Sequence, residues 1–173
     1  MILIRSARAR DVSNIARIHI DMWRVAYADL LAPEFLRELS YERSRRQWEA
    51  ILERHSGVLL VAESNEDGVV GFAAGGAERT RAFEVDGELT ALYVLAGHHR
   101  SGIGRALVRR MAKELDANGR EGMVVWVLST NPARGFYEHL GGEKAGEQRL
   151  HIGGESVRET AYLWRDLDEL AGG

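Results

Sequence analysis

The amino-acid sequence predicts a mixed α/β fold in which helices cover both faces of a mostly antiparallel central sheet. Three observations predict it. Apolar residues recur every three or four positions over 11–26, the spacing of a helix with one buried face. Apolar runs at 58–62 and 69–74 flank the turn signal Asn-Glu-Asp-Gly at 65–68, as in a β-hairpin. Residues 123–128 are all apolar, which indicates a strand buried on both faces.

The region before the hairpin is expected to hold one strand and three helices. Residues 2–6 form the strand, and Asp11 caps the first helix. Pro33 suits the first turn of a second helix, which extends to about residue 39. Ser40 is expected to cap a third helix. The buried side of that helix carries Trp48, Ile51 and Leu52.

The region after the hairpin begins with a strand over 88–95. A helix then extends from Gly102 to about residue 117, because its apolar residues are spaced by fours. Asn118 and Gly119 are a typical helix end.

The C-terminal region is expected to hold a helix over 131–140, which the glycines at 141–142 end. Residues 147–152 and 157–167 resemble an antiparallel pair of strands joined by two glycines at 153–154.

Length and composition indicate one soluble domain over residues 1–173. The formal net charge of −3 argues against nucleic acid as a partner. The chain has no cysteine, which excludes disulfides, thiolate metal sites and a cysteine nucleophile. No apolar run is long enough for a signal peptide or a membrane span, so we expect a cytoplasmic protein with no membrane partner. A homodimer is compatible with the sequence.

The segment 98–105, His-His-Arg-Ser-Gly-Ile-Gly-Arg, follows an apolar strand and opens a helix. The N–H groups and dipole of a helix start can bind an anion, and Gly102 and Gly104 let a phosphate approach them. A solvated glycine-tolerant turn is the alternative. The segment is not a P-loop, because it lacks the Lys-Ser/Thr pair of that motif. It is also a poor match to the dinucleotide-binding motif, which needs three glycines where this segment has two. Because His98 and His99 are adjacent and point apart, no metal site is expected.

Two segments resemble the motifs of the GNAT family of N-acetyltransferases, which transfer an acetyl group from acetyl-CoA to an amine. Residues 88–94 followed by 100–107 look like the main acetyl-CoA motif of the family. Residues 131–141 look like its second motif. The position that is usually Gln or Arg is His99, with an arginine one place later. The resemblance implies a GNAT-like mixed, mostly antiparallel central sheet with helices on both faces.

The resemblance also implies where acetyl-CoA binds, with no metal. The pantetheine arm would pair with the strand backbone, the pyrophosphate would take the loop amides, and Asn131 and its helix would flank the arm. Helix capping is the alternative for Asn131. The implied cofactor-binding residues are Leu92, Tyr93, Val94, His99, Arg100, Ser101, Gly102, Ile103, Gly104, Arg105, Asn131, Arg134 and Tyr137.

The resemblance makes Tyr137 the general acid, because a phenol with a pKa of about 10 can protonate a departing thiolate. The alternative is a core tyrosine beside Phe136. Glu88 would be the catalytic base or would hold the acceptor's ammonium group; a solvated strand-end carboxylate is the alternative. His19 is more readily explained as a satisfied core histidine.

The resemblance places the acceptor site around the end of the first helix and the loop after it, which implies Trp23, Tyr27 and Glu88 as acceptor-binding residues, with Asp29 nearby. Aromatics and carboxylates suit a cationic amine. A core position is the alternative for Trp23. Direct transfer in a ternary complex to the primary amine of a small molecule is the expected reaction, since no cysteine exists to carry an acetyl group. Two alternatives remain open: acetylation of a protein or peptide N-terminus, and a non-catalytic acyl-CoA sensor.

Overall fold

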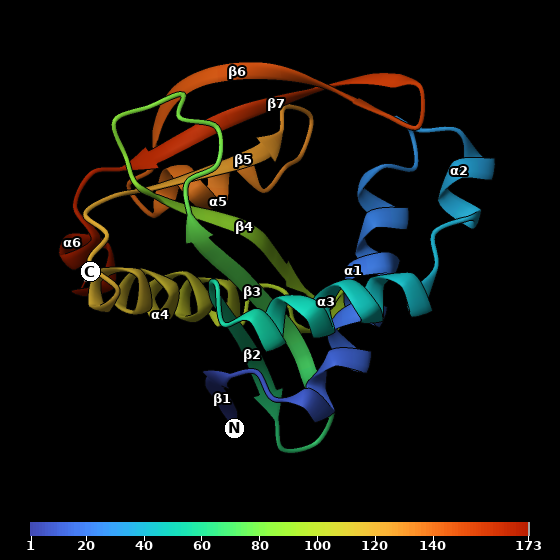
Figure 1. Cartoon of the computed structure of the whole chain (residues 1–173), viewed down its shortest axis with the longest axis horizontal. Coiled ribbons are helices and arrows are strands. Elements are labelled where there is room, and N and C mark those ends of the chain that lie inside the picture. The colour runs from blue at the N-terminus through green and yellow to red at the C-terminus, as the bar shows by residue number, and fades with distance from the viewer. Residues whose placement is uncertain (173) are drawn as a thin grey trace.

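The computed structural model describes residues 1–172, which contain a seven-stranded sheet in the order β1-β2-β3-β4-β5-β7-β6. All neighbouring strands are antiparallel except β4 and β5, which are parallel. Helices α1 and α3 cover one face of the sheet, and α4 covers the other (Figure 1). The predicted fold class, a mostly antiparallel sheet with helices on both faces, is therefore confirmed.

The strands are β1 (Ile2–Ser6), β2 (Val58–Ser64), β3 (Gly68–Ala77), β4 (Gly87–Val94), β5 (Met123–Leu128), β6 (Glu143–Ile152) and β7 (Glu155–Trp164). The helices are α1 (Val12–Ala26), α2 (Pro33–Arg37), α3 (Tyr41–Arg54), α4 (Ile103–Ala117), α5 (Arg134–His139) and α6 (Leu167–Gly172). No helix within residues 1–172 is long and apolar enough to cross a bilayer.

The start of α1 differs from the sequence-based expectation in one respect. Asp11 precedes the helix, but its side chain makes no capping bond to the helix backbone. Its carboxylate instead accepts hydrogen bonds from Nη1 and Nη2 of Arg5 at 2.7 and 2.9 Å, and from the Arg8 amide. Asp11 therefore ties the first strand to the start of α1, which a sequence pattern does not reveal.

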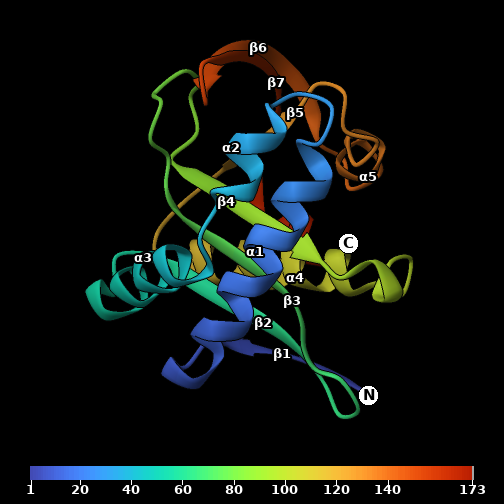
Figure 2. The same cartoon turned by 90° about the vertical axis from the view of Figure 1, so that its right-hand side faces the viewer.

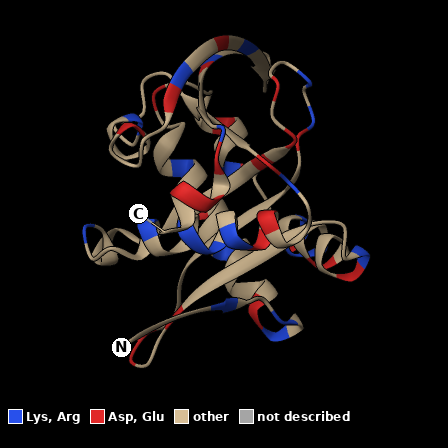
Figure 3. Cartoon of the chain, turned by 90° about the vertical axis from the view of Figure 1, so that its left-hand side faces the viewer, with Lys and Arg blue, Asp and Glu red and all other residues tan. Residues whose placement is uncertain are grey.

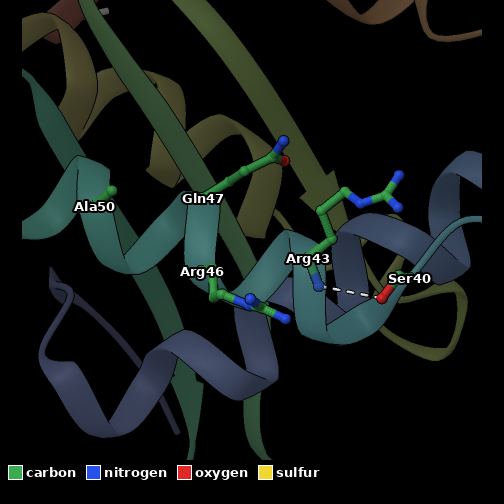
Figure 4. Close-up of a pocket in the computed structure, with 5 residues that line it drawn as sticks. All are labelled: Ser40, Arg43, Arg46, Gln47 and Ala50. Atoms are coloured by element: carbon green, nitrogen blue, oxygen red, sulfur yellow. Dashed lines mark hydrogen bonds between the residues drawn. The ribbon is translucent and has the colours of Figure 1, made fainter.

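Helix α3 begins as predicted, because the Ser40 hydroxyl accepts a hydrogen bond from the Arg43 amide at 3.2 Å (Figure 4). Trp48 is buried and Leu52 is partly buried against α1 and the sheet. The prediction that Ile51 lies on the buried side is wrong, since its side chain is 39% exposed. Ser40, Arg43, Arg46, Gln47 and Ala50 line a shallow surface groove of about 540 Å³.

The C-terminal half departs from the expected bounds, and strand β6 begins at Glu143 rather than at residue 147. Helix α5 begins at Arg134 rather than at residue 131, because the Asn131 side chain closes a turn onto the Ala133 amide first. Strand β7 ends at Trp164 rather than at residue 167; residues 165–166 lie between the elements, and Leu167 begins α6. Leu167 and Leu170 of this short helix are buried against α4.

The sheet separates two apolar cores. One lies between the sheet and α4 and includes Leu107, Met111 and Tyr137. The other lies beneath α1 and α3 and includes Ile15 and Phe72. Figure 2 shows α1 and α2 in front of β4 and beside the β6–β7 hairpin. This end of the sheet, where the strands diverge, carries the predicted site.

Candidate active site

Strands β4 and β5 pair over only part of their length. The parallel register joins Gly87, Glu88 and Leu89 to the first three residues of β5, and stops there. A β-bulge against Ala74 and Gly75 of β3 leaves Thr90 without a partner in the register and bends β4 at this point. Beyond Leu89 the two strands therefore diverge and leave a wedge-shaped opening in the sheet.

The second half of β4 has one paired edge and one free edge. Leu92, Tyr93 and Val94 pair with β3 on one side. On the side facing β5, none of the described strands pairs with them. Free backbone groups in an extended conformation can pair with an extended ligand. The sequence predicted that the pantetheine arm binds these same three residues.

The loop after β4 presents backbone amides to the opening of the wedge. Arg100 and Gly102 both have positive φ, at 59° and 83°, and Gly102 is the residue before the first turn of α4. No side chain caps α4, so the N–H groups of its first residues, 103–105, have no partner within the helix. Such amides form an anion-binding concavity.

Two side chains of the loop hold its shape. The His99 imidazole donates from Nε2 to the Val94 carbonyl at 2.7 Å, and the Ser101 hydroxyl donates to the His98 carbonyl at 2.5 Å. His99 therefore binds the end of β4. Its side chain, which the resemblance implied as the first contact of the motif with the cofactor, makes a hydrogen bond within the chain instead.

Gly104 has a packing role in the fold, in addition to the predicted one of leaving room for a phosphate. A Cβ atom added at Gly104 would lie 3.3 Å from the Phe136 ring of α5. Gly104 thus permits the close approach of α4 and α5, and a bulky substitution there would displace α5 as well as any ligand.

Tyr137 lies on the α4 face of the sheet at the wedge. Its side chain is 6% exposed, and its ring packs against Phe136, Tyr162 and Trp164. No described residue hydrogen-bonds its hydroxyl. Burial raises the pKa of Tyr137, and the nearby Tyr93 hydroxyl raises it further, so the phenol stays protonated at neutral pH.

The other predicted residues of the second motif have partners within the chain. Asn131 Oδ1 accepts a hydrogen bond from the Ala133 amide at 2.9 Å, which closes a turn before α5 and does not cap the helix, and its amide NH2 group can still donate to a ligand. The Arg134 guanidinium donates to the Tyr162 hydroxyl at 3.0 Å and to the Ser129 carbonyl at 2.9 Å. Both bonds fix α5 onto the sheet.

Glu88 is buried, with 1% of its surface exposed, so the solvated strand-end alternative is wrong. Its carboxylate accepts hydrogen bonds from the Arg79 guanidinium at 2.7 and 3.0 Å and from the Arg79 amide at 3.1 Å. Arg79 lies in the β3–β4 loop, nine residues away, and the sequence analysis did not find it. The only available signal was a basic residue in the turn that returns the chain to β4.

The aromatic residues predicted for the acceptor site do meet, at the wedge on the α1 face. Trp23 stacks on Tyr27 with ring centroids 4.4 Å apart and donates from Nε1 to the Tyr93 hydroxyl at 3.1 Å. Asp29 lies exposed outside this group. Burial raises the pKa of Tyr93 to about 12, with Glu159 of β7 adding to the rise. Glu159 is a second residue that the sequence analysis missed.

His19 lies next to this aromatic group. Trp48 Nε1 donates to His19 Nδ1 at 3.2 Å, and the Ser44 hydroxyl lies 3.1 Å from the same atom. Burial lowers the pKa of His19 to about 4. The expectation of a satisfied core histidine is confirmed.

Charged groups near the loop are mixed in sign. A cleft of about 370 Å³ beside α4 is lined by Arg105 and Arg109 together with Glu143 and Asp166. Basic and acidic segments are interspersed over this side of the chain (Figure 3). Within residues 1–172, no group of three His, Asp or Glu side chains could hold a metal ion.

Solved structures share this fold. A ribosomal-protein-alanine N-acetyltransferase from Brucella melitensis superposes with a TM-score of 0.74 at 24% identity, covering 94% of this chain and 99% of that one. The structure of yncA from Salmonella typhimurium with its cofactor acetyl-CoA gives a TM-score of 0.71 at 24% identity, covering 95% and 93%. The chain thus shares the fold of these solved structures.

Sequence comparison gives the family. Residues 70–152 match the FR47-like protein family. The N-acetyltransferase YuaI of Bacillus subtilis (strain 168), itself uncharacterized, is 34% identical over 170 residues, which cover 98% of this chain and 96% of that protein. The chain belongs to the GNAT family of acetyl-CoA-dependent N-acetyltransferases.

Proposed function

We propose that this acetyltransferase transfers the acetyl group of acetyl-CoA directly to the primary amine of a small molecule, within a ternary complex. The observation that carries the proposal is the wedge between β4 and β5, which combines a strand edge that no described strand pairs with the hydroxyl of a buried tyrosine that has no partner among the described residues. We further propose that residues 1–173 form one catalytic domain, which acts in the cytoplasm.

The residues around the wedge fit acetyl-CoA. An extended pantetheine arm would pair with Leu92, Tyr93 and Val94, which no described strand pairs on the side facing β5, although the Val94 carbonyl already accepts the hydrogen bond from His99. The pyrophosphate would take the amides of 103–105, with Arg100 and Arg105 as cationic donors. The remaining proposed contacts are His99, Ser101, Gly102, Ile103, Gly104, Asn131, Arg134 and Tyr137.

Transfer requires the amine nitrogen to attack the thioester carbonyl carbon, the carbon–sulfur bond to break, and two protons to move. Tyr137 gives its hydroxyl proton to the departing thiolate, because burial keeps the phenol protonated until then. Glu88 takes the proton that the amine loses. Arg79 donates hydrogen bonds to both Glu88 oxygens. The proton therefore reaches Glu88 either through a water molecule or directly, after the Arg79 side chain has turned outward.

The acceptor would enter from the α1 face, where Trp23 and Tyr27 stack. Aromatic faces attract cationic amines. Glu88, the third residue proposed for the acceptor site, lies at the end of the wedge and is paired with Arg79. Direct transfer is supported by the absence of cysteine from the sequence, since no thiol can carry the acetyl group.

The experiment is to incubate the protein with acetyl-CoA and a panel of small amines and peptides, and to follow free thiol release. The proposal expects acceptor-dependent release with at least one small amine. Release only with peptides would favour N-terminal acetylation instead. Acetyl-CoA binding in calorimetry with no release for any acceptor would favour a sensor.

A further inference from the structure

Glu159 lies at the centre of an otherwise apolar face. On β7 it stands between Val157 and Ala161, which point to the same side of the sheet. Val157 packs with Tyr27 and Leu31, and Ala161 packs with Val124 beside Phe83 and Trp126. A partly buried carboxylate thus separates two apolar clusters.

The carboxylate of Glu159 has no cationic partner. No Lys, Arg or His nitrogen of residues 1–172 lies within 4.0 Å of it. Its one hydrogen bond within that part of the chain comes from Gln148 Nε2 to Oε2 at 2.9 Å. By contrast, the buried carboxylates of Asp11 and Glu88 are each paired with an arginine. A partly buried carboxylate that forms no ion pair can bind a cation that a ligand supplies; the Arg79 guanidinium lies within electrostatic reach of Glu159 but pairs with Glu88.

The surroundings of Glu159 suit such a cation. Burial raises the pKa of Tyr27, and the charges of Tyr93 and Glu159 raise it further, so Glu159 lies within electrostatic reach of the aromatic group at the wedge. Trp126 is two positions from Leu128, the β5 partner of Glu159, and therefore lies on the same face. Its indole N–H is buried without a partner in the described chain, and a hydrogen-bond acceptor elsewhere on the ligand, not its ammonium group, would satisfy it.

We infer that Glu159 binds the positive charge of the acceptor, so that the acetyltransferase selects cationic amines over neutral molecules of the same shape. The inference rests on the proposed function and deepens it. Glu88 is neutralised by Arg79, whereas the Glu159 oxygen Oε1 accepts no hydrogen bond from the described residues. Glu159 therefore supplies the specificity, and the stacked rings of Trp23 and Tyr27 lie beside the bound cation.

The test measures binding and turnover separately. Phenethylamine and phenethyl alcohol have nearly the same shape and differ in charge, and their Kd values are measured by calorimetry with coenzyme A present. Wild type should bind the amine roughly tenfold more tightly. Glu159→Gln should abolish that preference while still accepting the Gln148 hydrogen bond, and Glu159→Asp should restore part of it. Glu155→Gln removes an exposed carboxylate from the same strand and should keep the preference.

The other outcomes contradict either the role of Glu159 or the proposed function. Equal affinity of wild type for the two ligands, or a preference that survives in a folded Glu159→Gln protein, overturns the role of Glu159. Thiol release with acetyl-CoA and amines tests the proposed function on its own. A charge preference without acetylation of any acceptor contradicts the proposed function and leaves the cation site standing.

Discussion

Replacing Tyr137 by phenylalanine removes one oxygen atom from the candidate acid and little else. The hydroxyl makes no hydrogen bond with the described residues, and the ring keeps its contacts with Phe136, Tyr162 and Trp164. We therefore expect the free energy of unfolding to change by less than about 1 kcal/mol, since no internal hydrogen bond is lost.

The catalytic effect of Tyr137→Phe should be much larger than its effect on stability. Loss of a positioned general acid lowers rates by roughly 100- to 10,000-fold. Because the mutation leaves the free edge of β4 and the loop amides intact, the Kd of acetyl-CoA should stay within about threefold of wild type. The defect should therefore lie in kcat, the pattern of an interaction made only in the transition state.

The assay follows thiol release at saturating acetyl-CoA and acceptor, with calorimetry for cofactor binding and urea unfolding for stability. Tyr41→Phe serves as the matched control, because Tyr41 is 44% exposed and bonds to Asp21 on the surface. A folded Tyr137→Phe protein with a kcat near that of wild type would refute the acid role and assign that proton to a water molecule.

Three further predictions concern the loop, the base and the buried histidine. Arg105→Ala should weaken acetyl-CoA binding about tenfold at low salt, and less at high salt, whereas Arg110→Ala on the same helix should not; equal effects in calorimetry would contradict a phosphate contact. Glu88→Gln should lower kcat most at neutral pH, with the defect shrinking as the amine deprotonates at higher pH; a pH–rate profile parallel to that of wild type would exclude proton transfer by Glu88. His19 has a folded-state pKa of about 4 against an ordinary value of 6.5, so its contribution to stability is complete above pH 6.5 and is lost as pH falls towards 4. Urea unfolding should show a loss of about 2 kcal/mol from this group near pH 5, absent in His19→Gln; the same pH dependence in both proteins would contradict it.

The sequence predicted those parts of the fold that local patterns determine. The apolar spacing of α4 and the all-apolar run of β5 each specify an element without reference to the rest of the chain, and both elements have the predicted bounds to within a residue. Helix α6 was missed because its Leu167 and Leu170 follow a strand directly, with six residues too few to display a period.

Residues of the candidate site could be proposed from the sequence only where they lie within one motif. The loop before α4 and the start of α5 are contiguous segments, so their residues could be named from the sequence. Arg79 reaches Glu88 across the turn between two strands, and Glu159 reaches the α1 face from β7, so each depends on the register of the sheet. The bonding of Asp11 could not be predicted for the same reason. Its partner Arg5 lies on β1 and not on the helix that Asp11 precedes.

The divergence of β4 and β5 also has a kinetic consequence. The sheet separates two cores, and the gap between β4 and β5 connects them. Tyr137 belongs to the core on the α4 face and Tyr93 to the core on the α1 face. Two substrates that enter from opposite faces of the sheet would not block each other. Neither would then have to bind first, and initial-rate patterns should be those of a random sequential mechanism, with each product free to leave by the side from which its precursor came.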